Sequence, residues 1–388
     1  LVVEYFRSVT AYLSIIQGLK NEYSIGVYQV NLNLNDISKN KASQQKFLRY
    51  CKKLGADLLE NEQVNTSVLV IPQRPMSKEV ISSIKKNINA KVTNLMLGFA
   101  HSGVPKYDSI LNEFNFKKVY AIDKSFINYL LSARNQKYIY DDIDMVEVGL
   151  PFGQYPVHEN FQADYIFAMP TLYSFAYESD KWYFLEAVRI LFNNINKTDI
   201  IVHKPHNGAE EDQFSSYKMR MILEKIDWII GFEFFLKSII KIAPGIKLKN
   251  LFEKLYTAYL YKNILKRTID MSTAGGQSYL GIEAYLPGVR KGVIGGTSNT
   301  IWGTLFYKLR FYNCVDILNQ KRDGEKKLYG NKRASQFLEL NLKYFMVPFF
   351  KGELQFDTEL WDIPSNGSRA GNLIKELKKE INFIRNLK

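Results

Sequence analysis

The stretch Asp199-Ile200-Ile201-Val202-His203-Lys204-Pro205-His206-Asn207-Gly208 places a short apolar run directly before a polar loop. Such a run, bounded by turn-forming residues, is typical of a buried strand. In open α/β sheets, ligands bind beyond the carboxyl ends of the strands, where the loops begin. Two imidazoles and an ammonium group at that point, from His203, Lys204 and His206, are donors suited to a phosphate. A metal site or a pair of structural histidines is the alternative interpretation.

Similar apolar runs alternate with segments of helical period along most of the chain. This alternation predicts parallel sheets joined by crossover helices, and therefore an α/β fold. The expected strands are 24–30, 67–71, 118–122, 164–168 and 199–202, and the expected helices are 44–54, 77–89, 125–133 and 181–194.

The length of 388 residues exceeds what one hydrophobic core usually supports, so we expect two domains. Two glycines and two prolines in 149–156 mark the expected boundary. The N-terminal domain is expected over 1–156 and the C-terminal domain over 157–368, with a helical insertion at 214–267. A basic amphipathic helix in 369–388 is expected to pack back on the first domain.

Composition excludes several classes of protein. With 46% hydrophobic and 23% charged residues, the chain has the balance of a globular protein and not of a disordered one. Its two cysteines, Cys51 and Cys314, are far apart, which predicts no disulfide framework and no cysteine metal site, and favours the cytoplasm. Residues 1–7 lack the pattern of a signal peptide, and no apolar run is long enough to predict a membrane-spanning helix.

The formal net charge of +13 indicates an anionic partner. Nucleic acid is not expected, since no zinc-finger, RNP or helix-turn-helix pattern is found. An anionic membrane surface or an anionic substrate fits the charge. The alternative is a lysine-rich composition that reflects only an AT-rich genome.

A second glycine-rich segment follows a short apolar run and opens an apolar helix. Its residues are Gly295, Gly296, Thr297, Ser298, Asn299 and Thr300. Backbone amides at the start of a helix bind anions, and the hydroxyl groups add donors. A plain helix N-cap at Ser298, Asn299 or Thr300 is the alternative.

Several further side chains are candidates for contacts with a substrate. Glu283 stands among apolar residues, where an unpaired carboxylate is costly, so a ribose diol or a salt bridge would satisfy it. The carboxylates of Asp141, Asp142 and Asp144 suit a general base or a nucleophile, with a solvated acidic turn as the alternative. His101 is a candidate contact for an acceptor or a sugar, or else a capped loop histidine.

In order and spacing these segments resemble the bacterial GT-B glycosyltransferases that use CMP-activated ulosonic acids, namely the sialyltransferases and the Kdo transferases. Asp141-Asp142 resembles their acidic motif, with Ile143 in place of glycine. His206 resembles their motif histidine, with Asn207 in place of proline. Glu283 resembles their ribose-binding glutamate.

The resemblance extends to the glycine-rich segment, where Ser298 matches the first serine of a Ser-Ser motif and Asn299 replaces the second. It implies two Rossmann-like domains facing a cleft, and transfer from a CMP-sugar without a metal or another cofactor. The substitutions bring the chain closer to the retaining β-Kdo transferase modules of O-antigen and capsule synthesis than to the sialyltransferases.

The same resemblance implies a place and a set of partners. The acceptor would be a lipopolysaccharide O-antigen or capsule glycan, or a lipid-linked glycan, at the inner membrane. A cytoplasmic enzyme would be held at that membrane by the basic, aromatic stretch 214–267 and by the C-terminal helix. Other domains of a larger glycosyltransferase are further expected partners. A sialyltransferase, a polyol-phosphate transferase of the CDP-glycerol type and a non-catalytic nucleotide-binding scaffold at the membrane are the alternatives.

Overall fold

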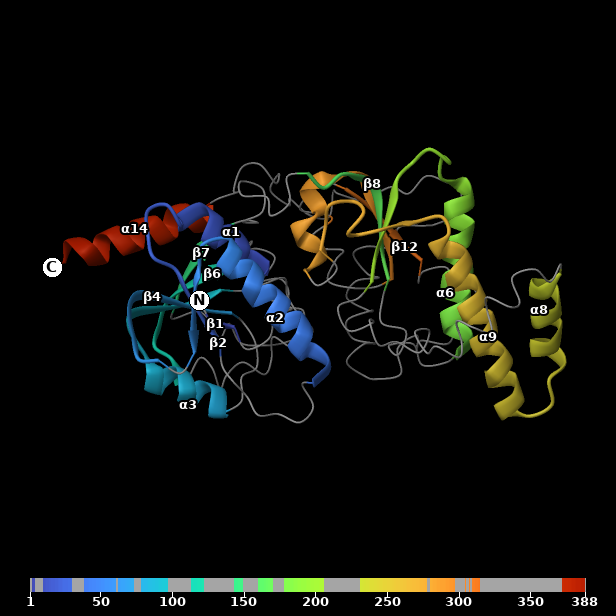
Figure 1. The fold of residues 1–388 in the computed structure, drawn as a ribbon, viewed down its shortest axis with the longest axis horizontal. Helices are drawn as coiled ribbons and strands as arrows, with labels where there is room; N and C mark the ends of the chain where they lie inside the picture. The colour runs from blue at the N-terminus through green and yellow to red at the C-terminus, as the bar shows by residue number, and fades with distance from the viewer. Residues whose placement is uncertain are drawn as a thin grey trace. The chain divides into compact units, whose positions relative to one another are not determined.

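The computed structural model describes residues 2–3, 10–29, 38–60, 62–72, 78–96, 113–121, 143–148, 160–169, 178–205, 231–277, 280–296, 304, 307, 309–314 and 372–387. The chain divides into two compact units, each described by itself below (Figure 1). Unit 1 comprises Leu1–Glu159, Tyr279–Pro287 and Pro364–Lys388, and unit 2 comprises Asn160–Ser278 and Gly288–Ile363. The predicted α/β fold with parallel sheets is confirmed in both.

Unit 1 is built on parallel strands. One sheet has the order β1 (Val2–Val3), β2 (Gly26–Gln29) and β3 (Asp57–Glu60), and a second has the order β4 (Val64–Pro72), β5 (Ile88–Met96), β6 (Phe116–Ala121) and β7 (Asp144–Glu147). Strands β1 and β4 lie side by side, so the strands of the unit follow the order 3-2-1-4-5-6-7. The helices α1 (Thr10–Leu19), α2 (Ser38–Lys53) and α3 (Lys78–Asn87) are the crossovers β1–β2, β2–β3 and β4–β5.

Strand β5 replaces the end of an expected helix. The helix predicted over 77–89 ends at Asn87, and β5 begins at Ile88 without an intervening turn. Exposed and partly buried side chains alternate from Ile88 to Lys91, which is the pattern of a strand at a sheet surface. Sequence patterns do not reveal this strand, because no glycine or proline separates it from α3. The helix expected at 125–133 lies outside the described residues.

The C-terminal helix α14 (Asn372–Asn386) packs within unit 1, against α1 and β4. Its buried Leu373, Ile374 and Leu377 supply the apolar face of the contact. Gly18 of α1 permits the close approach, since an added Cβ would lie 3.0 Å from the side chain of Ile374. The helix expected at the end of the chain is therefore present and lies on the unit that contains the N-terminus.

A buried carboxylate fastens α14 to the sheet. Glu380 accepts a hydrogen bond of 2.8 Å from the hydroxyl group of Tyr120 on β6, and another from the side-chain amide of Asn94 on β5. The ammonium group of Lys118 lies 3.7 Å from the same carboxylate. Burial and the neighbouring Glu380 raise the pKa of Tyr120, which keeps its phenol a donor at neutral pH.

Unit 2 has a doubly wound sheet of parallel strands. Their order is β10 (Ile269–Asp270), β9 (Ile201–Lys204), β8 (Ala163–Ala168), β11 (Val289–Gly295) and β12 (Arg310–Asn313). Counted along the unit, this is 3-2-1-4-5, the strand order of the Rossmann fold. The first five strands of unit 1 follow the same order.

The helices α6 (Glu178–Asn194) and α9 (Ile246–Leu265) lie side by side over one face of this sheet (Figure 1). Phe167 of β8, Val188 of α6 and Leu260 of α9 meet in the same apolar core. A shorter helix, α8 (Phe232–Ile242), precedes α9 and packs beside it.

The described part of the expected insertion 214–267 belongs to the fold itself. Helix α9 lies between β9 and β10 in the chain and buries Tyr256, Leu260 and Ile264 in the core of the unit. It therefore takes the position of a crossover helix. No described helix has the length and hydrophobicity needed to cross a bilayer.

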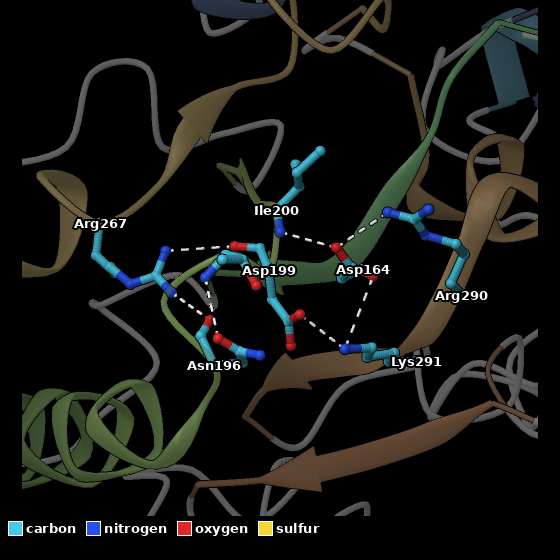
Figure 2. A network of polar contacts seen from close by, with 8 residues as sticks. Asp164, Asn196, Asp199, Ile200, Arg267, Arg290 and Lys291 are labelled. Carbon is cyan, nitrogen blue, oxygen red and sulfur yellow. Dashed lines mark hydrogen bonds and ion pairs between the residues drawn. The ribbon is translucent and has the colours of Figure 1, made fainter.

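Charged side chains close the amino edge of the unit 2 sheet (Figure 2). Asp164, at the start of β8, accepts a hydrogen bond of 2.9 Å from the backbone N–H of Ile200, just before β9. It accepts another of 3.0 Å from the side chain of Arg290 on β11. Lys291 donates to Asp199 at 2.7 Å, and Arg267 donates to two carbonyl groups of the turn before β9. These contacts connect β8, β9 and β11 at their amino ends. The carboxyl ends of the three strands lie at the opposite edge of the sheet.

Candidate functional site

At the carboxyl edge of the unit 2 sheet, one residue of each predicted motif lies in the same row. Ala168 of β8 is in register with Lys204 of β9 on one side and with Gly295 of β11 on the other. Side chains at paired positions of a sheet share a face. Since adjacent strands are about 4.8 Å apart, the backbones of Lys204 and Gly295 are about 10 Å apart across β8.

This row also lies where the winding of the sheet reverses. After β8 the chain continues through β9 to β10 on one side, whereas β11 and β12 lie on the other. The switch point is thus between β8 and β11. Ligands of open α/β sheets bind outside the carboxyl ends of the strands at such a point.

The close packing of these strands favours a glycine at position 295. A Cβ at this position would lie 3.0 Å from the carbonyl oxygen of Ala168 and 3.6 Å from the ring of Phe311. Gly295 and Gly296 are buried and present only backbone at the edge. Thr297, Ser298, Asn299 and Thr300 lie outside the described residues, so the helix start that they are expected to form stays a prediction.

Lys204 supplies a positive charge at the end of β9. Its side chain is buried, and its ammonium group donates a hydrogen bond of 2.9 Å to the carbonyl oxygen of Pro205. The hydrogen bond therefore keeps the ammonium group next to the end of β9. An ammonium group in such a partly dehydrated position interacts more strongly with an anion than one in water.

His203 lies on the opposite face of the sheet, where it does not take the phosphate-binding position that the sequence predicted. Its Nε2 is 3.0 Å from the hydroxyl group of Tyr261 on α9, and its ring packs against Phe167 with centroids 5.6 Å apart. Burial, and next the charge of Lys204, lower its pKa to about 4, so the imidazole is neutral at neutral pH. It occupies the core beneath α9 as a hydrogen-bonded structural histidine. His206, the other imidazole of the motif, lies outside the described residues.

Glu283 is not in the unit that holds Lys204 and Gly295. It belongs to the 3-10 turn η5 (Ile282–Ala284), which groups with unit 1, and its side chain is partly buried. Its predicted contact with a ribose stays a prediction.

The predicted acidic cluster is described only at Asp144. This residue is exposed and begins β7, in register with Lys118 of β6. It stands at the amino end of its strand, away from the carboxyl edge where ligands of parallel sheets bind, so its position does not favour a catalytic role. Asp141, Asp142 and His101 lie outside the described residues.

Ala168, the central residue of the row, is not among the site residues predicted from the sequence. The run 164–168 was identified as a strand, but no part in a site was assigned to its end. The cue in the sequence is the small side chain of alanine at the end of the buried run 164–168. A bulkier side chain there would occupy the space between Lys204 and Gly295.

Neither cysteine nor metal chemistry is indicated by the described residues. Neither Cys51 nor Cys314 forms a disulfide, and both are buried. Within that part of the chain, no group of three or more histidine, cysteine, aspartate or glutamate residues is arranged to hold a metal ion.

No protein-family model matches the chain, and no curated protein matches its sequence. Among solved structures, the chain is similar to one described as an S. aureus MnaA–UDP co-structure, with a TM-score of 0.36 and 14% sequence identity. The similarity covers 92% of this chain and 98% of that one. A likeness of this size carries no inference about activity, which rests on the residues themselves.

Proposed function

We propose that the protein is a GT-B-type glycosyltransferase whose unit 2 binds a nucleotide sugar at the carboxyl edge of its sheet. The observation that carries the proposal is the row Lys204–Ala168–Gly295 at the switch point of a Rossmann-ordered sheet. A fixed ammonium group on one side and a bare glycine backbone on the other suit a phosphate. The shared strand order of the two units supports the GT-B part of the proposal.

In the proposed reaction, unit 2 stabilises the departing nucleotide. Lys204, His206 and the backbone and hydroxyl donors of 296–300 neutralise the phosphate as the glycosidic bond breaks. Such pre-positioned donors lower the barrier because charge develops on the leaving group in the transition state. His203 is a positioning residue here, since its contact with Tyr261 holds the end of β9 against α9.

The proposed donor is a CMP-activated ulosonic acid, with Kdo as the first choice, because of the family resemblance of the motifs. Loss of CMP from such a ketose leaves an oxocarbenium-like centre. Asp141 or Asp142 would act on it as a nucleophile or a base, and Glu283 would hold the ribose. The acceptor would be an O-antigen, capsule or lipid-linked glycan at the inner membrane.

Nucleotide binding by a lysine variant tests the donor site. We expect isothermal titration calorimetry to show CMP binding by the purified chain, weakened about tenfold or more by Lys204→Met, because a charged hydrogen bond to the phosphate is lost. Lys197→Met, at an exposed lysine of the same unit, is the matched control and should bind CMP like the parent protein. Undiminished binding by a folded Lys204→Met protein would refute the site.

Transfer assays test the reaction itself. The parent protein and His206→Ala are offered CMP-Kdo, CMP-sialic acid and CDP-glycerol with a glycan acceptor. Transfer from CMP-Kdo that is lost in His206→Ala supports the proposal. Transfer from CDP-glycerol alone would identify a polyol-phosphate transferase instead, and CMP binding without transfer from any donor would favour a scaffold.

A further inference from the structure

Large apolar side chains are exposed where α8 turns into α9. Ile242 and Ile246, on either side of the connection 243–245, are 77% and 79% exposed. Leu248 and Leu251 on the first turns of α9 are exposed as well. Single apolar residues at a surface are ordinary, but a group of them gathered at one turn marks a contact surface.

The hairpin that presents these side chains is firmly held by its other face. Phe232, Leu236 and Ile240 of α8 are buried. Glu233 of α8 accepts a hydrogen bond of 2.7 Å from Arg189 of α6. Lys237 forms ion pairs of 2.6 Å with Glu186 and 3.1 Å with Glu233. Helix α8 is therefore anchored by its other face, whereas the first turns of α9, from Ile246 to Leu251, are exposed on every side.

The charge of this surface has one sign. The sequence from Phe234 to Phe252 contains four lysines and no aspartate or glutamate. Lys237 is paired within the fold, whereas Lys241, Lys247 and Lys249 are exposed beside the apolar side chains. Apolar side chains rimmed by lysines, with no acidic residue among them, complement an anionic lipid surface.

We propose that the α8–α9 tip, defined as residues 241–251, docks on an anionic lipid bilayer. Ile242 and Ile246 enter the boundary between headgroups and acyl chains, and the three exposed lysines contact the lipid phosphates. The proposal concerns unit 2 alone and is independent of the nucleotide that the unit binds.

The C-terminal helix offers a second surface, which serves as the comparison. Its exposed Phe383 and Leu387 border a cavity of about 510 Å³ that is also lined by lysines of β5, β6 and α14. Two carboxylates, those of Glu376 and Glu380, line the same cavity. Because these two carboxylates cancel part of the positive charge of the lysines there, the α8–α9 tip is the better match for an anionic surface.

Co-sedimentation with lipid vesicles tests the docking. The full chain is expected to bind vesicles of phosphatidylcholine and phosphatidylglycerol, to bind pure phosphatidylcholine much more weakly, and to dissociate as salt is raised. Ile242→Ser combined with Ile246→Ser should lower partitioning about tenfold or more, because two apolar side chains no longer leave water. Lys247→Gln combined with Lys249→Gln should lower it about fivefold per lysine.

Phe383→Ser combined with Leu387→Ser is the matched control, because it removes exposed apolar side chains elsewhere and should leave binding unchanged. Circular dichroism verifies that each variant is folded, and CMP binding should be the same in all of them. Three results would overturn the proposal: no binding to either vesicle, equal binding to both, or loss of binding only in the Phe383 and Leu387 variant.

Discussion

Replacement of His203 by phenylalanine is expected to change how the stability of unit 2 depends on pH. The imidazole is buried against Phe167 and bonded to Tyr261, and its pKa in the folded protein is lowered to about 4. In the unfolded chain its pKa returns to the ordinary value of 6.5. Phenylalanine keeps a ring in the core but cannot take up a proton.

The size of the effect follows from these two pKa values. As pH falls below 6.5, His203 takes up a proton in the unfolded chain but not in the folded protein. The unfolded state is therefore stabilised, and the free energy of unfolding decreases. Stability from this residue is fully present above pH 6.5 and is lost progressively down to about pH 4. The loss between about pH 7.5 and about pH 5 is about 2 kcal/mol, and the full loss is about 3 kcal/mol.

Urea unfolding followed by tryptophan fluorescence provides the assay. Trp182 of α6 packs against Tyr256 of α9 with ring centroids 5.5 Å apart, so its emission reports on the core of unit 2. At about pH 7.5 His203→Phe should be less stable than the parent protein, because the bond to Tyr261 is worth about 1 kcal/mol. On going to about pH 5, the difference between the two proteins should shift by about 2 kcal/mol in favour of the variant.

A second variant separates titration from hydrogen bonding. Tyr261→Phe removes the partner of His203 but keeps the imidazole, so it should cost about 1 kcal/mol and retain the pH dependence of the parent. If the stability of His203→Phe stays a constant distance below that of the parent from pH 7.5 to pH 5, the imidazole is not held neutral by burial. The assignment of His203 to the core would then be wrong.

Three further perturbations have defined outcomes. Glu380→Ala should lower the free energy of unfolding by about 2–3 kcal/mol in urea unfolding followed by circular dichroism, because buried donors of β5 and β6 lose their acceptor. The control Glu376→Ala removes a carboxylate whose partner lysine is exposed, so it should lower the free energy of unfolding by less than about 1 kcal/mol. Burial raises the pKa of Cys51 to about 12, so a thiol reagent at about pH 8 should modify Cys51 only after denaturation. Gly288→Ala should cost about 3 kcal/mol in the unfolding of unit 2, because the new Cβ would lie 2.0 Å from the carbonyl oxygen of Phe161; a change below 1 kcal/mol would contradict that packing.

Local patterns in the sequence were sufficient to predict the fold class and several of its strands. The runs 164–168 and 199–202 correspond to β8 and β9, and the helix 181–194 corresponds to α6, because apolar periodicity and turn residues are properties of neighbouring positions. The same patterns placed Lys204 in the loop after the run 199–202 and Gly295 at the end of a short apolar run, whereas in the structure each is the last residue of its strand. Strand β5 was missed because helix and strand meet there without a turn signal.

Tertiary structure alone decided which side chains of the motifs share a surface. His203 and Lys204 are neighbours in sequence, but successive side chains of a strand point to opposite faces. The face of His203 is covered by α9, which follows more than 40 residues later, whereas Lys204 shares a row with Gly295, which is more than 90 residues away. Strand order and register arise from pairing between distant segments, and no periodicity within one segment encodes them. The sequence alone therefore predicted both motifs, and the sheet decides that Lys204, and not the adjacent His203, lies on the same face as Ala168 and Gly295.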